Sequence, residues 1–167
     1  VGPAHERFAE DALRVVRAGR FIAELDLTPD SKLTQAAGRE ARNMSRLSAE
    51  RIRDELSKLL VGKTPSRGLF WLDHAKILTK IIPMLEKAKG VDQGGWHRYD
   101  VFRHTLTSID LAPPDLIVRM ALLFHDIEKP RARTRDERGY HFFGHYRKGT
   151  ATTEKISSPS ATSSQKR

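Results

Sequence analysis

Apolar residues recur at intervals of three and four along much of this chain, and charged residues fill the positions between them. Between residues 4 and 24, Phe8, Ala12, Val15 and Val16 are apolar and recur at this spacing. Another sector of the same helical projection is charged and contains Glu10, Asp11, Arg14 and Arg17. A period of 3.6 residues is typical of an amphipathic helix, so the pattern predicts one continuous helix over about residues 4–24.

Capping residues divide the next part of the chain into separate helices. One helix is predicted over much of 30–45, with Asp30 or Ser31 as its N-cap. The next is predicted to begin after Ser48, a favoured N-cap, and to end at Gly62. The apolar stripe of this second helix contains Ile52, Leu56, Leu59 and Leu60.

Shorter segments continue the helical pattern towards the C-terminus. Short helices are predicted around 65–75 and 76–88. Glycines mark a linker at residues 90–98, beyond which a helix is predicted at about 99–111. Two prolines then break the chain, and an apolar segment covers residues 115–127. Almost no stretch alternates between apolar and polar residues, so we expect an all-α fold.

These segments predict two helical regions and a tail. The first region covers residues 1–89, the linker follows, and a shorter region covers residues 99–150. Residues 151–167 are rich in Ser and Thr and contain no aromatic side chain. Such a stretch buries too little apolar surface to offset the entropy lost on ordering, so we predict a disordered tail. With 167 residues, the chain is long enough for one domain or two small ones.

The charge balance indicates a polyanionic partner. The chain has 30 Lys and Arg against 21 Asp and Glu, which gives a formal net charge of +9. Nucleic acid is the leading candidate for such a partner. The absence of cysteine excludes disulfides and thiolate metal sites. No segment is apolar for long enough to span a bilayer, and the N-terminus lacks the apolar region of a signal peptide. We therefore expect no membrane partner and a cytoplasmic location.

The adjacent residues His125 and Asp126 form the most specific chemical pattern in the sequence. They combine imidazole and carboxylate, a ligand mixture that divalent Mn, Ni and Fe accept, and such a metal can generate hydroxide near neutral pH. His104 lies far enough upstream for a helix, a loop and a second helix to return it to the pair, and His145 follows at a similar remove. These four residues are the predicted metal ligands, with His125 and Asp126 as catalytic candidates. The alternative is a structural role for each histidine.

Two charged motifs resemble those of one family. The first has the pattern Glu-Asp-x-x-Arg-x-x-Arg and contains Glu10, Asp11, Arg14 and Arg17. The second has the pattern Glu-Arg-x-x-x-Glu and contains Glu50, Arg51 and Glu55. Both resemble motifs of the bacterial class II tRNA nucleotidyltransferases and poly(A) polymerases, the CCA-adding and A-adding enzymes. Residues 99–149 look like the HD domain of some members, through His104, the His-Asp pair and the Phe142-Phe143-Gly144-His145 segment.

The resemblance implies roles for the charged residues. Asp11 and Arg14 would read the Watson–Crick edge of an incoming ATP or CTP, with Arg17 one turn further along the helix. A carboxylate accepts from an exocyclic amine, and a guanidinium donates to ring nitrogen and carbonyl groups. The residues that would support this helix are Glu10, Glu50, Arg51 and Glu55. The alternative is ordinary pairing within each helix, between acids and arginines three or four positions apart.

The sequence also departs from the family pattern. Members carry an N-terminal catalytic head with metal-binding carboxylates, whereas this chain starts just before the nucleotide-reading helix and contains no Asp-x-Asp pair. Because phosphoryl transfer needs carboxylates to hold Mg²⁺, we expect that the chain does not add nucleotides without a separate catalytic head. HD phosphohydrolases usually supply a later aspartate, but none follows Asp136, and Glu128 stands where the family tends to have Gly.

Three interpretations follow from these patterns. The first is a C-terminal fragment of an RNA nucleotidyltransferase that contributes nucleotide selection and binding of tRNA or other RNA, with a truncated HD domain. The second is a metal-dependent HD phosphohydrolase acting on phosphomonoesters or cyclic phosphodiesters, in which Lys129 or Arg131 orients the phosphate. The third is a helical remnant with neither activity, which either binds RNA or is inert.

Overall fold

The computed structural model describes residues 2–92, 98–137 and 139–144, and almost all of its elements are helical. In chain order they are α1 (Ala4–Glu10), α2 (Leu13–Leu25), α3 (Ser31–Arg39), the 3₁₀ helix η1 (Glu40–Arg46), α4 (Ala49–Leu60), α5 (Pro65–His74), α6 (Leu78–Ile81), α7 (Pro83–Glu86), α8 (Val101–Leu111), α9 (Leu116–Phe124), α10 (Lys129–Ala132), β1 (Thr134–Asp136) and β2 (Gly139–His141). The predicted all-α fold is confirmed. His145 and the predicted tail at residues 151–167 lie outside the described residues.

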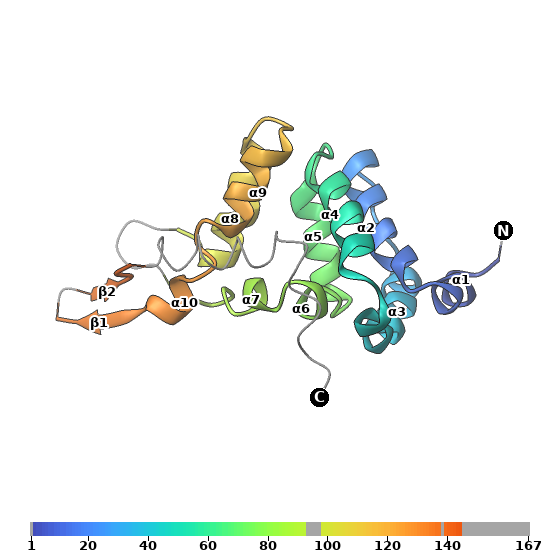
Figure 1. The fold of residues 1–167 in the computed structure, drawn as a ribbon, viewed down its shortest axis with the longest axis horizontal. Coiled ribbons are helices and arrows are strands. Elements are labelled where there is room, and N and C mark those ends of the chain that lie inside the picture. The colour runs from blue at the N-terminus through green and yellow to red at the C-terminus, as the bar shows by residue number, and fades with distance from the viewer. Residues whose placement is uncertain (1, 93–97, 138, 145–167) are drawn as a thin grey trace.

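The helices form two groups along an elongated molecule. Figure 1 shows helices α1 to α5 together at one end, which we name the α1–α5 bundle. The α8–α9 pair stands beside this bundle, and the β1–β2 hairpin lies at the opposite end of the molecule. None of the helices in the described part of the chain combines the length and apolar character that crossing a membrane requires.

The predicted continuous helix over residues 4–24 is wrong at Asp11, where one helix ends and another follows. Asp11 has an extended backbone conformation, with φ −151° and ψ 105°. Its Oδ1 accepts a hydrogen bond from the backbone N–H of Leu13 at 3.1 Å, which satisfies one of the free donors at the start of α2. Phe8 before the break and Val15 after it are both buried. The apolar period therefore continues across the break, and periodicity alone did not reveal it.

Two other predicted helices are also interrupted. The segment 30–45 begins with Asp30, whose side chain accepts from the N–H of Leu33 at 2.6 Å, but it becomes 3₁₀ helix after Arg39. The segment 76–88 contains Pro83, which has no N–H to continue the helix and therefore starts a separate turn.

The other helices lie within their predicted segments, and one small hairpin was not predicted. Helices α4, α5, α8 and α9 fall within their predicted ranges, and the Ser48 side chain caps α4 as expected. Strand β1 pairs antiparallel with β2, with Arg135 opposite Tyr140. Strands of three residues are too short to show the alternation from which a strand is predicted.

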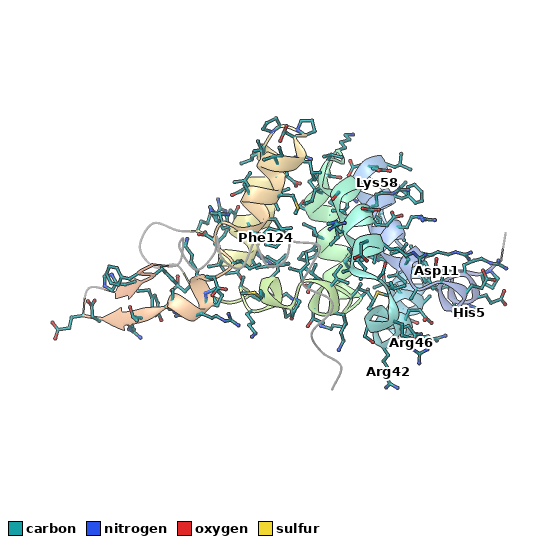
Figure 2. All side chains as sticks on the ribbon, in the orientation of Figure 1. His5, Asp11, Arg42, Arg46, Lys58 and Phe124 are labelled. Carbon is teal, nitrogen blue, oxygen red and sulfur yellow. The ribbon has the colours of Figure 1, made fainter. Side chains whose placement is uncertain are left out.

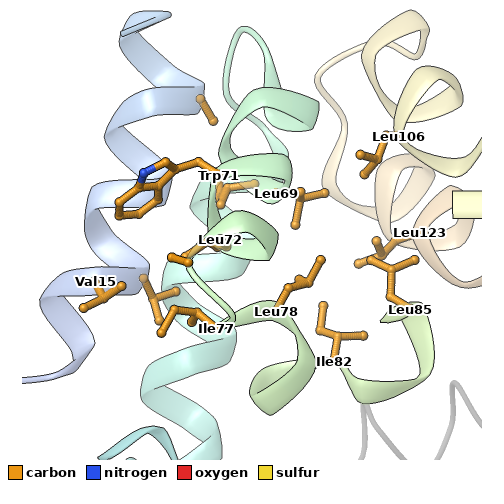
Figure 3. Close-up of a cluster of buried hydrophobic side chains, with 14 of the residues drawn as sticks. Val15, Leu69, Trp71, Leu72, Ile77, Leu78, Ile82, Leu85, Leu106 and Leu123 are labelled. Atoms are coloured by element: carbon orange, nitrogen blue, oxygen red, sulfur yellow. The ribbon is translucent and has the colours of Figure 1, made fainter. Parts of the chain in front are cut away.

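The core of the α1–α5 bundle forms where α2 packs against both α4 and α5. Its fully buried side chains include Val15, Leu69 and Leu72, and Figure 3 shows them in one continuous cluster that reaches Leu123 on α9. Two glycines allow the close crossing of α2 and α5. A Cβ atom at Gly68 would lie 2.5 Å from the carbonyl oxygen of Gly19, so a side chain there would push the helices apart.

Arg119 joins the α8–α9 pair to the bundle. Its side chain is buried, and its guanidinium donates to the carbonyl oxygen of Leu60, the last residue of α4, at 2.6 Å and to that of Gly62 at 2.7 Å. The same guanidinium donates to the carbonyl oxygen of Ala112 at 2.9 Å, after the end of α8. Carbonyls at helix C-termini carry partial negative charge and lack partners within the helix, so a buried cation suits this position.

Candidate functional site

The junction between α1 and α2 faces α4, and Asp11 lies at this junction (Figure 2). Its Oδ1 accepts from the N–H of Leu13, and its Oδ2 lies 2.8 Å from Nη2 of Arg51 on α4. Partial burial opposes ionisation, but these two hydrogen bonds outweigh it and lower the pKa of the Asp11 carboxyl below its ordinary value. The carboxylate is therefore charged at neutral pH and is oriented by a residue far away in the sequence.

Arg14 lies in the first turn of α2 and pairs with α1. Its Nη1 donates to Glu10 at 2.6 Å and to the carbonyl oxygen of Arg7 at 3.1 Å. Within the described residues, no hydrogen bond or ion pair joins Arg14 to Asp11. The pairing between nearby acids and arginines is thus found for Glu10 and Arg14. These contacts use one terminal nitrogen, and the Arg14 side chain is 38% exposed, so its other N–H groups can reach a ligand.

Glu55 forms a second link between α4 and α2. Its side chain is 5% exposed, with Oε1 3.0 Å from Nε of Arg17 and Oε2 3.3 Å from Nε of Arg20. Arg17 and Arg20 stand three residues apart on one face of α2, so both reach the same carboxylate. The alternative pair between Arg51 and Glu55 within α4 does not form, because each side chain turns towards α1 and α2 instead.

Two of the three predicted supporting residues on α4 therefore contact the α1–α2 segment, and one does not. Arg51 and Glu55 make these contacts, whereas Glu50 lies exposed in the first turn of α4. Arg20 was missed in the sequence, although its three-residue spacing from Arg17 is a signal that could have identified it. The arrangement leaves Asp11 and Arg14 oriented and accessible at one edge of the bundle.

A second cluster lies on the α8–α9 pair. His104 comes from α8, and His125 and Asp126 follow directly after α9. Nε2 of His125 lies 3.1 Å from Oδ2 of Asp126, and Nε2 of His104 lies 3.8 Å from the same oxygen. One potential ligand atom from each residue lies within 4.8 Å of the others. Three of the four predicted metal ligands are thus together, and His145 lies outside the described residues.

The hydrogen bonds of this cluster define which atoms could bind a metal. Nδ1 of His125 lies 2.7 Å from the carbonyl oxygen of Leu122 and can donate to it, which leaves Nε2 as the ligand atom of the neutral ring. The hydrogen bond with Asp126 raises the pKa of His125, although burial opposes this. Burial also opposes ionisation of Asp126, but hydrogen bonds from His125 and Lys129 lower the pKa of its carboxyl to about 2.

The donor set fits a divalent metal, and one neighbouring residue opposes binding. Two imidazole nitrogens and one carboxylate oxygen suit Mn, Fe, Ni or Zn. However, Nζ of Lys129 lies 2.7 Å from Oδ2 of Asp126, so a cation would have to displace this ammonium group or share the carboxylate. Of the two residues predicted to orient a phosphate, only Lys129 contacts the cluster, because Arg131 pairs with Glu128 at 3.4 Å.

Comparison with known proteins relates this chain to RNA enzymes. Residues 26–89 match a family described as "Probable RNA and SrmB- binding site of polymerase A". The chain is 34% identical to the A-adding tRNA nucleotidyltransferase of Deinococcus radiodurans, over 92% of this chain and 38% of that protein. It is 33% identical to the CC-adding tRNA nucleotidyltransferase of Thermus thermophilus, over 84% of this chain and 35% of that protein. A CCA-adding enzyme of Pediococcus pentosaceus is 37% identical over 56% of this chain.

The matches differ in what they cover. The family match at residues 26–89 includes α3 to α7 but neither Asp11 nor the His-Asp cluster. The Deinococcus and Thermus proteins match most of this chain, yet the chain spans only 38% and 35% of their lengths.

Proposed function

The chain belongs to the family of tRNA nucleotidyltransferases and poly(A) polymerases, and on this premise we propose that it supplies nucleotide selection and RNA binding for CCA or A addition at tRNA 3′ ends. The observation that carries the proposal is the double link from α4, in which Arg51 contacts Asp11 and Glu55 contacts Arg17. These links hold the α1–α2 junction in place before a nucleotide arrives, which reduces the entropy lost on binding.

The proposed nucleotide-reading groups are Asp11 and Arg14, with Arg17 one turn further along α2. The Asp11 carboxylate keeps acceptor capacity beyond its two described hydrogen bonds, so it can accept from an exocyclic amine. ATP and CTP carry such an amine, whereas GTP and UTP present a carbonyl at the corresponding position. An ionised carboxylate cannot donate to a carbonyl, so this group favours ATP and CTP.

RNA binding is proposed for the basic surface within residues 26–89. Arg42 and Arg46 project from η1 at the edge of the bundle (Figure 2), and neither side chain has an ion-pair partner among the described residues. Together with the net charge of +9, they suit the phosphates of tRNA or other RNA. Binding should therefore weaken steeply as salt rises. The proposed domain division at residues 1–89 and 99–150 and the cytoplasmic location remain predictions.

The transfer reaction itself is proposed to depend on a catalytic head. Nucleotidyl transfer of this class needs carboxylates that hold Mg²⁺, and the present sequence contains no Asp-x-Asp pair to do so. The head can be part of a longer polypeptide or a separate chain. In either case the residues described above would position the nucleotide base and the RNA, and they would not contact the transferred phosphate.

Nucleotide binding tests this proposal directly. Calorimetric titration of the full chain with ATP, CTP, GTP and UTP should show a preference of at least about 5-fold for the two amine-bearing bases. Asp11→Asn should remove that preference, because the amide can also donate to a carbonyl. The control is Asp54→Asn, which changes an exposed acid on α4 that makes no described ion pair. Equal binding of all four nucleotides by the unmodified chain would contradict the proposal.

A second candidate function is metal-dependent phosphoester hydrolysis at the α8–α9 pair. It is favoured by the convergence of His104, His125 and Asp126 within 4.8 Å. These residues would hold a divalent Mn, Ni or Fe ion, which supplies a hydroxide nucleophile near neutral pH when bound. Lys129, which contacts Asp126, would neutralise a phosphate group of the substrate. His145 stays a predicted further ligand.

Hydrolysis of a chromogenic phosphodiester in the presence of Mn²⁺ or Ni²⁺ tests the second function. Asp126→Ala should abolish the activity, because it removes the one carboxylate of the donor set. His5→Ala is the matched control, since His5 is an exposed histidine on α1. Activity that survives Asp126→Ala would exclude this cluster as its source.

A further inference from the structure

A groove of about 470 Å³ separates the exposed faces of α5 and α8. Helix α5 contributes Phe70 to its wall, helix α8 contributes Arg103, and Tyr99 lies just before α8. The two helices pack against each other below the groove through buried residues such as Leu69 and Leu106. These packed residues form the base of the groove, which is open to solvent along its length.

The walls of the groove carry exposed aromatic rings. Phe70 and Tyr99 are each 41% exposed, so both rings can be reached from solvent. The ring of His74 lies 4.6 Å from that of Phe70 and extends the aromatic surface along α5. The guanidinium of Arg98 lies 5.9 Å from the ring of Tyr99. Exposed rings of this kind are platforms on which unpaired nucleic-acid bases stack.

The charges around the groove favour an anion at one position. Arg103 is exposed, and its side chain makes no ion pair with any described residue. Arg67 is already paired with Asp26, and Asp110 accepts hydrogen bonds from the N–H and hydroxyl of Ser66 at the start of α5. Asp110 thus faces the N-terminus of α5, where negative charge is stabilised. The guanidinium of Arg103 can therefore pair with a phosphate.

We propose that this groove binds a single-stranded RNA segment, with a base stacked on Phe70 and a phosphate paired with Arg103. The inference rests on the proposed RNA-binding function and extends it, because the family match ends at residue 89 while Arg103 and Tyr99 lie beyond it. A single strand fits better than a duplex, since only unpaired bases expose a face to an aromatic ring.

The test compares two RNA hairpins that differ only by a three-nucleotide single-stranded 3′ extension. Binding to the full chain is measured by fluorescence anisotropy, with 2-aminopurine placed in turn at each unpaired position to report stacking. The extended RNA should bind more tightly than the blunt one. Phe70→Ala should weaken binding of the extended RNA by about 5- to 100-fold, with little effect on binding of the blunt RNA. Phe70→Trp should retain both the affinity and the 2-aminopurine quenching.

The charge contact has its own variant and matched controls. Arg103→Ala should weaken binding of the extended RNA. It should also lower the salt dependence of this binding by about one phosphate contact. Arg135→Ala and Phe143→Ala remove an exposed arginine and an exposed ring from the β1–β2 hairpin segment, away from the groove, and should leave the difference between the RNAs unchanged. Thermal melting checks that each variant is folded.

The outcomes separate the groove from the wider proposal. If the unmodified chain binds RNA but Phe70→Ala and Arg103→Ala behave like the controls, the groove is not the single-strand site. Equal affinity of the unmodified chain for the extended and blunt RNAs also overturns the assignment of the groove as the single-strand site. If the unmodified chain binds neither RNA, the proposed RNA-binding function fails, and the groove assignment fails with it.

Discussion

The two charged clusters of this protein are built in opposite ways. At the α1–α2 junction, Asp11 and Arg17 pair with residues far away in the sequence, Arg51 and Glu55, and only Arg14 pairs locally, with Glu10. At the end of α9, His125 and Asp126 are neighbours in the chain, and only His104 must be brought in by the fold. The first cluster therefore depends on the packing of three helices, and the second on one helix pair.

The difference shows how each cluster is prepared for a ligand. Asp11 and Arg51 orient each other, while Glu55 is buried between two arginines that hold α2 against α4. In the His-Asp cluster, the Lys129 ammonium group contacts the carboxylate that a metal would use. The internal pairs stabilise the first cluster, whereas in the second a metal would displace Lys129 from Asp126 or share the carboxylate with it.

Removing Glu55 should have the largest effect on the first cluster. Glu55→Ala leaves Arg20, whose side chain is 16% exposed, without its buried counter-charge. We expect a loss of about 3 kcal/mol in the free energy of unfolding, at the low end for broken buried pairs because Arg17 is partly solvated. Urea denaturation measures it. Glu50→Ala on the same helix is the control, and equal losses for both variants would show that the α4–α2 link is not stabilising.

Metal binding at the second cluster should stabilise the folded chain. Mn²⁺ or Ni²⁺ at about 100 times its dissociation constant should stabilise the folded chain by about 2.7 kcal/mol, seen as a rise in Tm. Asp126→Asn should abolish the rise, and Lys129→Met should tighten metal binding because it removes the competing ammonium group. A Tm increase that persists in Asp126→Asn would place the metal elsewhere.

Substitution of Arg119 tests how strongly its hydrogen bonds join the α8–α9 pair to the α1–α5 bundle. Arg119→Met keeps the length and apolar stem of the side chain but leaves two buried carbonyl oxygens and one partly buried one without this donor. A destabilisation of about 2 kcal/mol is expected from chemical denaturation. Arg135→Met, on the exposed strand β1, should change stability by less than about 0.5 kcal/mol. A similar small value for both variants would mean that the Arg119 hydrogen bonds do not stabilise the joint.

The smallest expected effect concerns the pH dependence of the Asp11–Arg51 pair. The folded pKa of Asp11 is lowered, so the pair stabilises the protein above the unfolded pKa, near 3.8, and this stabilisation is lost as pH falls through the folded value. Asp11→Asn should therefore cost less than about 1 kcal/mol at pH 7, and the difference from the unmodified chain should shrink in acid. Urea titrations between pH 3 and 7 measure this. A difference that grows towards low pH would contradict the assignment.

Most of the fold followed from local patterns in the sequence. The caps at Asp30 and Ser48 have the predicted side-chain hydrogen bonds, since capping is decided within one turn. The break at Asp11 was missed because the residue looks like part of a helical stripe, and the extended backbone and the bond to Leu13 that mark the break appear only in the structure.

The candidate site was predictable to a different extent in each cluster. Adjacent ligands such as His125 and Asp126 are visible in the sequence, and one helix pair suffices to add His104. The partners of Asp11 and Glu55 depend on which face of α4 turns towards α2, which the packing of the bundle decides. Arg51 and Glu55 were expected to support the α2 helix, but their specific partners could not be predicted from helical spacing.

The joint at Arg119 has a consequence for how the two regions can evolve. All three of its acceptors are main-chain carbonyl groups, so no particular side chain is required at Leu60 or Ala112 for the contact to form. Mutations can accumulate in either region without removing the acceptors, provided that the two helix ends stay in place. Arg119 supplies the donors to all three carbonyl groups, and Asp110 adds a second link by accepting from Ser66, so most of the surface of both regions can diverge while their mutual orientation is inherited.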